Sequence, residues 1–289
     1  MEKIKRADRL VFLSTLLTRN PNVLFSLTDL GEITGAAKST ISEDLSIVKE
    51  VLGQFSLGEL ASIAGAAGGV KYQPTQESDT TFSFLQELAL VLSDPERIIP
   101  GGFVYMTDII YDPKTVCRIG EIFYTQFKDA HPDYIVTMET KGIPPALMTA
   151  RAFNVPLIII RDASRVTEGS SVSINYISGS TRRIQTMSLS RRALPEGSRV
   201  LIIDDFMKGG GTAKGMQELM GEFNAPVIGT GVVVATREPG EKLVRDYYSL
   251  LELITIDESH KGIIIEPAGS ERAEENKGDL LEKRNNKNK

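Results

Sequence analysis

Residues 200–216, VLIIDDFMKGGGTAKGM, carry the clearest chemistry in this chain. A run of apolar residues ends in two adjacent carboxylates, Asp204 and Asp205. Each carboxylate can accept two hydroxyl hydrogen bonds, so the vicinal diol of a ribose is a natural partner, either directly or through Mg²⁺. The pattern therefore predicts a sugar-binding site at the end of a buried strand.

A loop of small residues follows the acid pair. Gly209, Gly210 and Gly211 allow backbone N–H groups to converge on a phosphate. A helix that opens at Thr212 adds the positive end of its dipole, the Thr212 hydroxyl adds a donor, and Lys208 adds a full charge. The loop is not a P-loop, because no Gly-Lys-Ser/Thr follows at the right spacing. An ordinary strand–turn–helix connection with an Asp N-cap is the alternative, and it leaves the second Asp and the triple glycine unexplained.

Apolar runs alternate with helical stretches around this motif. Runs such as LIII are apolar at every position, which is typical of a parallel sheet covered on both faces. Ligands in such α/β folds bind outside the carboxyl ends of the strands, where the acid pair falls. Candidate strands cover residues 103–106, 133–138, 155–160, 171–177, 199–205, 227–235 and 250–256, and candidate helices cover about 114–129, 143–153, 212–223 and 239–247.

The acid pair and its glycine loop resemble the phosphoribosyl pyrophosphate (PRPP) motif of type I phosphoribosyltransferases. The resemblance implies that Thr140, Lys141 and Gly142, in ETKGIPPA, hold the pyrophosphate. It also implies a mobile flap over the site at residues 161–192. Residues 161–199 carry seven arginines against three acidic residues, an excess that could draw phosphorylated ligands or DNA.

The first 74 residues predict three helices followed by a two-stranded hairpin. Apolar residues recur at helical spacing near residues 7–18, 27–33 and 41–55. ASIAG and VKYQP have the character of short strands joined by a glycine-containing tip. This order is typical of a winged helix-turn-helix, whose third helix enters the major groove. A protein-interaction or dimerisation module is the alternative.

The predicted DNA contacts lie near the start of the first helix, at the start of the third helix and beside the wing. Glu43 and Asp44 in that helix would repel phosphates, so we expect them to turn away or to accept a hydrogen bond from cytosine. The formal net charge of −5 argues against indiscriminate nucleic-acid binding. The candidate DNA-binding residues are Arg6, Arg9, Lys38, Ser39, Thr40, Ser42 and Lys71.

Length and composition set the domain plan. With 289 residues, 41% of them hydrophobic, the chain can form one large domain or two smaller ones. A proline-containing polar stretch, YQPTQESDTT, suggests a boundary near residue 75. We therefore expect a DNA-binding domain at 1–74, an α/β domain at 75–265 and a disordered polar tail at 266–289.

Cysteine content and the amino terminus exclude several protein classes. Cys117 is the single cysteine, so neither an intrachain disulfide nor a cysteine metal cluster can form. No metal site made by protein residues alone is predicted. The charged start, MEKIKRADRL, is not signal-like, and no apolar run is long enough for a membrane span. A cytoplasmic protein is expected.

Taken together, the two halves resemble the purine operon repressors of Gram-positive bacteria over nearly the whole chain. That resemblance implies that the small domain binds operator DNA of purine genes as part of a homodimer, and that PRPP binding to the large domain relieves repression. The stretches that carry the likeness are AKSTISEDL, AGAAGGVKY, PERIIPGGFVYMTDI, KGIP, VTEGSSVSINYISGS, RIQTMSLS and VLIIDDFMKGGGT.

A working purine phosphoribosyltransferase with an accessory N-terminal module is the competing hypothesis. Lys208 favours a sensor, because purine-using enzymes often place a carboxylate or a small hydroxyl residue there. No base-recognition insert is evident beyond residue 256 either, so no catalytic residue is assigned. Phe103 and Phe206 could stack on a purine, in which case a purine nucleotide such as guanosine tetraphosphate would compete with PRPP. Two core phenylalanines are the alternative.

Overall fold

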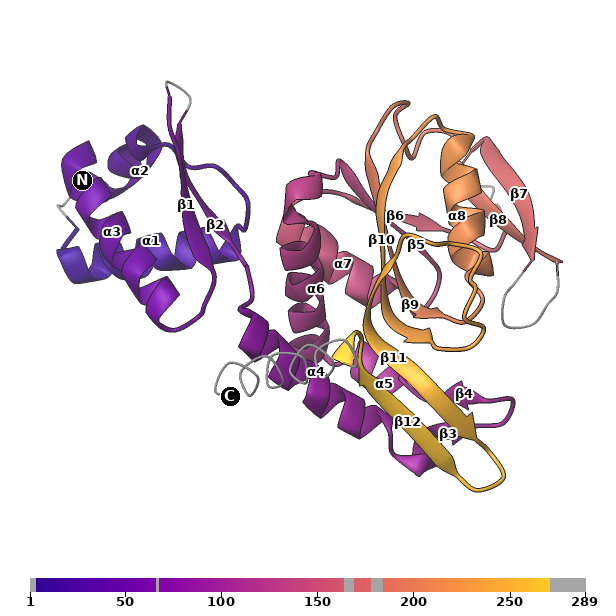
Figure 1. Ribbon diagram of the computed structural model, residues 1–289. Helices are drawn as coiled ribbons and strands as arrows, with labels where there is room; N and C mark the ends of the chain where they lie inside the picture. Colours follow the sequence, from indigo (N-terminus) through magenta and orange to yellow (C-terminus); the bar gives the residue numbers. More distant parts are fainter. Residues whose placement is uncertain (1–3, 66–67, 164–168, 178–183, 271–289) are drawn as a thin grey trace, which may run out of the picture.

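The computed structural model describes residues 4–65, 68–163, 169–177 and 184–270. These residues form an N-terminal helical domain, a connecting helix and a larger α/β domain (Figure 1). The expected flap falls partly outside the described residues, and so does the expected disordered tail from residue 271 onward. Within the described part of the chain, no helix is long and apolar enough to cross a membrane.

The N-terminal domain has the predicted order of three helices and a hairpin. Ser26 caps the second helix by accepting a hydrogen bond from the Asp29 amide, and Gly35 ends that helix at φ +66°. The hairpin strands pair antiparallel, from Glu59 opposite Gln73 to Ile63 opposite Gly69. The elements are α1 (Arg6–Arg19), α2 (Leu27–Thr34), α3 (Lys38–Gln54), β1 (Glu59–Ile63) and β2 (Gly69–Gln73).

The core of this domain follows from the apolar spacing of its third helix. Ile41, Leu45, Val48 and Leu52 are all buried, because the spacing puts them on one face of α3. They pack against buried leucines of α1 and α2 and against the inner residues of the hairpin. This packing leaves the opposite face of α3 exposed.

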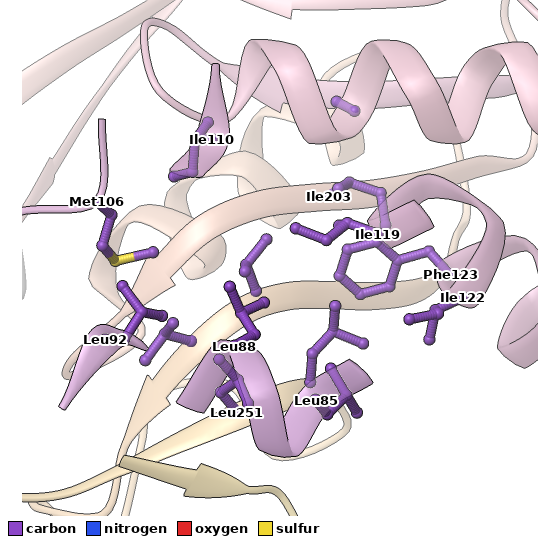
Figure 2. Packing of buried hydrophobic residues seen from close by; sticks show 14 of the residues in the cluster. Leu85, Leu88, Leu92, Met106, Ile110, Ile119, Ile122, Phe123, Ile203 and Leu251 are labelled. Atoms are coloured by element: carbon purple, nitrogen blue, oxygen red, sulfur yellow. The ribbon is translucent and has the colours of Figure 1, made fainter. Parts of the chain in front are cut away.

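A connecting segment leads from the small domain to the large one. Apolar residues of α4 face the large domain, where Leu85, Leu88 and Leu92 are buried beside strands of the main sheet (Figure 2). The segment comprises α4 (Ser78–Leu92), η1 (Pro95–Arg97), the short pair β3 (Ile98–Ile99) and β4 (Phe103–Val104), and α5 (Thr107–Ile110). Of the strand predicted at 103–106, only the first two residues form a strand, β4.

The large domain is built on a six-stranded sheet in the order β12-β11-β10-β9-β5-β6. Five neighbouring strands are parallel and β12 is antiparallel at one edge. The strands are β5 (Tyr134–Met138), β6 (Leu157–Ile160), β9 (Val200–Met207), β10 (Val227–Thr236), β11 (Tyr248–Asp257) and β12 (Gly262–Pro267). The fold class predicted from the alternating pattern is confirmed.

Helices cover both faces of this sheet, as the wholly apolar strands predict. On one face, Ile119 and Phe123 pack with Ile203 of the sheet (Figure 2). On the other, Met216 and Leu219 pack with Ile202 and its neighbours. The first face carries α6 (Pro113–Phe127), η2 (Lys128–Ala130) and α7 (Ile143–Phe153); the second carries α8 (Gly211–Gly221) and the hairpin β7 (Ser171–Ile177) and β8 (Ile184–Ser190).

Three segments differ from the sequence-based expectation. Residues 239–247 contain no helix. The segment instead hydrogen-bonds to the glycine loop, where the Leu243 amide donates to Gly209 O at 3.0 Å. The Lys242 ammonium likewise donates to Lys208 O at 2.8 Å. Strand β8 pairs with β7, and β12 extends past the expected domain end at residue 265. These pairings are long-range, and the local pattern does not reveal them.

Candidate functional site

The acid pair lies where β9 leaves the sheet. The Asp204 side chain is buried, 6% exposed, and its Oδ1 accepts a hydrogen bond from the Asp205 amide at 3.0 Å. Burial raises the pKa of Asp204 well above its ordinary value, and the neighbouring Asp205 charge raises it further. The Asp205 pKa is also raised by burial, although the Asp204 hydrogen bond and the Lys141 charge oppose the rise. Hydroxyl groups of a ligand that donate hydrogen bonds would stabilise the charged form of these two carboxylates.

The glycine loop turns the chain from β9 into α8. Gly210 has φ +78°, and α8 begins at Gly211. A Cβ atom at position 210 would lie 3.3 Å from the Leu243 and Val244 amide nitrogens, so the loop packs closely against residues 243 and 244. The Lys208 side chain is exposed beside this loop. The helix start and its preceding amides form the kind of anion site that the sequence predicts.

A second loop follows β5, the neighbouring parallel strand. The Glu139–Thr140 peptide bond is cis, and α7 begins just beyond, at Ile143. At Gly142 a Cβ atom would lie 2.3 Å from Thr137 Oγ1 and 2.7 Å from Asp204 Oδ1, so only glycine lets this turn approach the acid pair. Because β5 and β9 are adjacent and parallel, their carboxyl ends bring both loops to the same edge of the sheet.

A cavity of about 360 Å³ joins the predicted residues. Its polar side is formed by Lys141, the acid pair and the glycine loop from Lys208 to Thr212. Its apolar side includes Phe206 and, from the connecting segment, Phe103 with Ile99 and Met106. Phe103 is 42% exposed, so it is not a core residue. Thr140 and Gly142 lie in the adjoining turn and do not line the cavity.

A second, more polar cavity of about 550 Å³ lies between the acid pair and the β7–β8 hairpin. Asp204, Asp205, Phe206 and Thr212 line both cavities, so the acid pair stands between them. Several residues that line the two cavities were not among the predicted site residues. These are Ile99, Met106, Glu139, Asp162 and Tyr176, which fall within the stretches that carry the family resemblance or within the expected flap, although no local pattern marks them as individual site residues.

Glu139 ties the loop after β5 to the base of the expected flap. Its two carboxylate oxygens accept hydrogen bonds from Arg161 Nη1 at 3.0 Å and from the Asp162 amide at 2.9 Å. Burial acts to raise the Glu139 pKa, but these hydrogen bonds outweigh it and the pKa is lowered. Arg165, Arg182 and Arg183 of the flap lie outside the described residues.

On the N-terminal domain, four of the predicted DNA contacts lie in the first turns of α3, and Lys71 lies in β2. Lys38, Ser39 and Ser42 are exposed, and Thr40 and Lys71 are half-buried. A groove of about 440 Å³ between α3 and the hairpin is lined by Lys38 and Ser42. It is also lined by Ser46 and Lys49, which the sequence analysis missed although they follow Ser42 at helical spacing.

The prediction that Arg9 contacts DNA is wrong. Its side chain is 6% exposed and forms an ion pair with Asp44, whose side chain is 1% exposed. Arg6, 59% exposed, reaches the other oxygen of Asp44 at 3.2 Å. Asp44 therefore turns away from the exposed face of α3, as expected. Arg9 joins α1 to α3 and is not available to a phosphate.

The described residues contain no metal site made by protein side chains alone. No cluster of three or more His, Cys, Asp or Glu side chains with metal-binding geometry occurs among them. The two site carboxylates nevertheless suit Mg²⁺ that takes its remaining ligands from a phosphorylated sugar and water.

Comparison with known proteins covers both domains. A family model described as the bacterial purine repressor N-terminal domain matches residues 5–74, and a phosphoribosyl transferase domain model matches residues 106–268. The purine biosynthesis transcriptional repressor PurR of Bacillus subtilis is 48% identical over 264 residues, covering 91% of this chain and 93% of its own. This chain belongs to the bacterial purine repressor family.

Other members and more distant relatives define the limits of that family. In Lactococcus lactis, a relative named purine biosynthesis transcriptional activator PurR is 38% identical over 91% of this chain and 97% of its own. A xanthine phosphoribosyltransferase of the same species is 34% identical but covers only 59% of this chain. The enzyme thus matches little more than half of this chain, whereas the two regulators match nearly all of it.

Solved structures agree with the fold of the large domain. Adenine phosphoribosyltransferase of Saccharomyces cerevisiae superposes with a TM-score of 0.51 at 21% identity, covering 58% of this chain and 98% of the enzyme. The Rhodothermus marinus enzyme also gives a TM-score of 0.51, at 19% identity, over 59% of this chain and 99% of its own. At this level of identity, the likeness establishes a phosphoribosyltransferase fold.

Proposed function

We propose that this chain is a DNA-binding repressor of purine synthesis genes. PRPP, held in the large domain without turnover, acts as the inducer that lowers operator affinity. The cavity carries this proposal, because it joins a diol-binding acid pair to a helix N-terminus and Lys141. The regulators named above match the chain across both domains, which supports a sensor.

Each part of the site has a role in holding PRPP. Asp204 and Asp205 accept the ribose hydroxyls, directly or with Mg²⁺ between them. Amides of the glycine loop and the Thr212 hydroxyl hold the 5′-phosphate at the start of α8. Thr140, Lys141 and Gly142 hold the pyrophosphate at the start of α7. Lys208, exposed beside the loop, adds a fixed positive charge.

The DNA surface is the exposed face of α3 together with the hairpin. Lys38, Ser39, Thr40 and Ser42 contact bases and backbone from the major groove. Lys71 contacts the backbone near the wing. Two copies of the chain, binding two half-sites, form the operator-binding unit.

Repression is chosen over activation because the relative named a repressor is the more similar of the two cited, at 48% against 38% identity. A retention assay on a purine-gene promoter fragment, with and without PRPP, tests the direction. Weaker retention with PRPP supports an inducer, and stronger retention with PRPP contradicts it. Sedimentation of the free protein and of the DNA complex tests the dimer.

Variants locate the two sites. Asp204→Ala and Asp205→Ala should retain DNA but lose the PRPP response. Lys38→Ala and Lys71→Ala should weaken operator binding while PRPP affinity in the free protein is kept. Asp79→Ala, which removes an exposed carboxylate in the first turn of α4, is the matched control. An unchanged PRPP response in both acid-pair variants would refute the site assignment.

An active purine phosphoribosyltransferase is the second candidate, favoured by the 34% identity to a xanthine phosphoribosyltransferase. Pyrophosphate release from PRPP, measured with each purine base, separates the two. No release above background is expected. Clear turnover that Asp205→Ala abolishes would establish the enzyme.

The apolar side of the cavity suits a purine ring. Phe103 is exposed and Phe206 is half-buried, and both line the cavity. We therefore expect a purine nucleotide such as guanosine tetraphosphate to displace labelled PRPP. Failure of every purine nucleotide to displace it would end this part of the proposal.

A further inference from the structure

The two domains meet through a set of hydrogen bonds that the effector and DNA sites do not use. The turn between α1 and α2 and the end of β2 contact the outer ends of α6 and α7. Figure 1 shows α6 on the side of the sheet that faces the N-terminal domain, whereas α8 lies on the opposite side. The junction is therefore formed by the same helices that cover one face of the six-stranded sheet in the large domain.

Tyr124 of α6 is the centre of this junction. Its ring is buried, 2% exposed, and its hydroxyl donates to Asn22 Oδ1 at 3.0 Å. The same hydroxyl accepts a hydrogen bond from Gln73 Nε2 at 2.7 Å. A buried hydroxyl with both capacities used holds two segments of the small domain in one geometry relative to α6.

Asn22 extends the contact to α7. Its Nδ2 donates to Ala152 O at 2.6 Å, and its own amide donates to Tyr72 O at 2.8 Å. The residue has φ +58°, a left-handed conformation that asparagine tolerates better than most residues. Asn22 thus joins α6, α7 and β2 through a single side chain and its backbone.

The other end of α7 lies at the effector site. The helix begins directly after the Thr140–Gly142 loop, at Ile143, and ends at Phe153, so it is about 16 Å long. A helix moves largely as a rigid body, so a displacement of the loop at its start is carried to its last carbonyls. Those carbonyls include the one that Asn22 holds.

We propose that α7 is the mechanical link between the two sites, and that Asn22 is the positioning residue that transmits its movement to the DNA-binding domain. The inference rests on the proposed function, since it explains how PRPP at one end of the molecule changes DNA binding at the other. Anion binding at the loop shifts α7, and the Asn22 contacts turn that shift into a change in the angle of the small domain.

The covalent linker is an alternative path for coupling between the two sites. Its contacts differ from those of Asn22. Gln76 of the linker bonds to α6 alone: its amide donates to Thr125 Oγ1 and its Nε2 to Glu121 Oε2, both at 2.9 Å. It makes no hydrogen bond to α7 among the described contacts. Removing the Gln76 side chain tests the linker route, and removing the Asn22 side chain tests the α7 route.

The test variant is Asn22→Gly, which keeps the left-handed backbone and removes both side-chain hydrogen bonds. Four dissociation constants are measured in the full-length protein: operator DNA with and without PRPP, and PRPP with and without operator DNA. The ratio within each pair is the coupling factor, and linkage makes the two ratios equal. Thermal unfolding checks that each variant is folded.

In Asn22→Gly we expect the coupling factor to fall at least fivefold, while operator affinity without PRPP and PRPP affinity without DNA stay within twofold. Tyr72→Phe and Gln76→Ala should keep the wild-type coupling factor. The Tyr72 hydroxyl bonds to Leu57 O inside the small domain, so its loss is a matched change that spares the junction contacts to α7. If Asn22→Gly unfolds, Asn22→Asp replaces it: its Oδ1 can still accept from Tyr124, whereas its second carboxylate oxygen faces and repels Ala152 O, so the contact to α7 is broken.

The possible outcomes distinguish failure of the α7 link from failure of the proposed function. A wild-type coupling factor of one overturns the proposed function. A wild-type factor well above one that Asn22→Gly leaves within twofold overturns the α7 link and leaves the function standing. Equal losses in Asn22→Gly and Gln76→Ala would also overturn it, because they would assign the coupling to the junction as a whole.

Discussion

At the scale of single residues, burial decides what a charge can do. Arg9 and Arg6 are three positions apart in α1, yet one is enclosed with Asp44 and the other reaches it from solvent. Removing one partner of a buried ion pair leaves a desolvated charge, whereas an exposed pair contributes little. The two arginines should therefore behave very differently on substitution.

Arg9→Leu should lower the free energy of unfolding of the N-terminal domain by about 3 kcal/mol, because Asp44 keeps only its exposed partner. Arg6→Ala, the control, should cost less than about 1 kcal/mol. Urea unfolding followed by circular dichroism measures both. Equal, small losses would show that the buried pair is not needed for the fold.

At the scale of elements, the approach of the β5 loop to the end of β9 defines the site. Gly142 lies so close to Thr137 Oγ1 and Asp204 Oδ1 that a methyl group has no room. The loop therefore cannot accept a side chain without moving away from the acid pair.

Gly142→Ala should destabilise the large domain by about 1–3 kcal/mol through overpacking, and should weaken PRPP binding at least tenfold. Gly221→Ala is the control, since a Cβ atom there meets open space at the end of α8. Isothermal titration with PRPP and thermal unfolding report the two effects. If Gly142→Ala binds PRPP like the wild type, the loop does not hold the pyrophosphate.

Glu121 on α6 gives a pH test of the junction. Burial raises the pKa of its carboxyl, although hydrogen bonds from Cys117 and Gln76 and the Arg151 charge oppose the rise. A carboxyl whose pKa is raised by folding contributes stability at low pH, and that contribution is lost as the pH rises through the folded-state pKa.

Glu121→Gln removes this loss, because the amide stays uncharged and its oxygen can still accept from Gln76. The variant should gain stability relative to the wild type as the pH rises from below the ordinary carboxyl pKa of 4.5 toward neutrality. Unfolding free energies measured across that range test the sign. A difference that shrinks with rising pH would mean that the charged carboxylate is the favoured form in the folded protein.

At the scale of the whole molecule, a chain of net charge −5 must bind DNA through a localised basic face. Lys38 and Lys49 line the groove between α3 and the hairpin. If they contact phosphates, each releases about one counterion when DNA binds.

Lys49→Gln should reduce the slope of log operator affinity against log salt concentration by about one, and should weaken binding to operator and unrelated DNA alike. Lys214→Gln on α8, in the other domain, is the control. Fluorescence anisotropy at several salt concentrations measures the slope. An unchanged slope would remove Lys49 from the DNA interface.

The sequence by itself determined the elements whose signals are local. The acid pair, the glycine loop and the helix after it are contiguous, so their chemistry can be read along the chain. The spacing of Ile41, Leu45 and Val48 likewise places α3 and its buried face. Each of these predictions depends on residues within a few turns of one another.

Tertiary structure decided the rest, because the deciding contacts join distant residues. Arg9 is assigned to the core by Asp44, which lies in another helix. Residues 239–247 bond to the glycine loop instead of forming a helix. The junction through Asn22 links the small domain to Ala152, 130 positions away. Local periodicity holds no record of such pairs, since they form only when separate elements pack together.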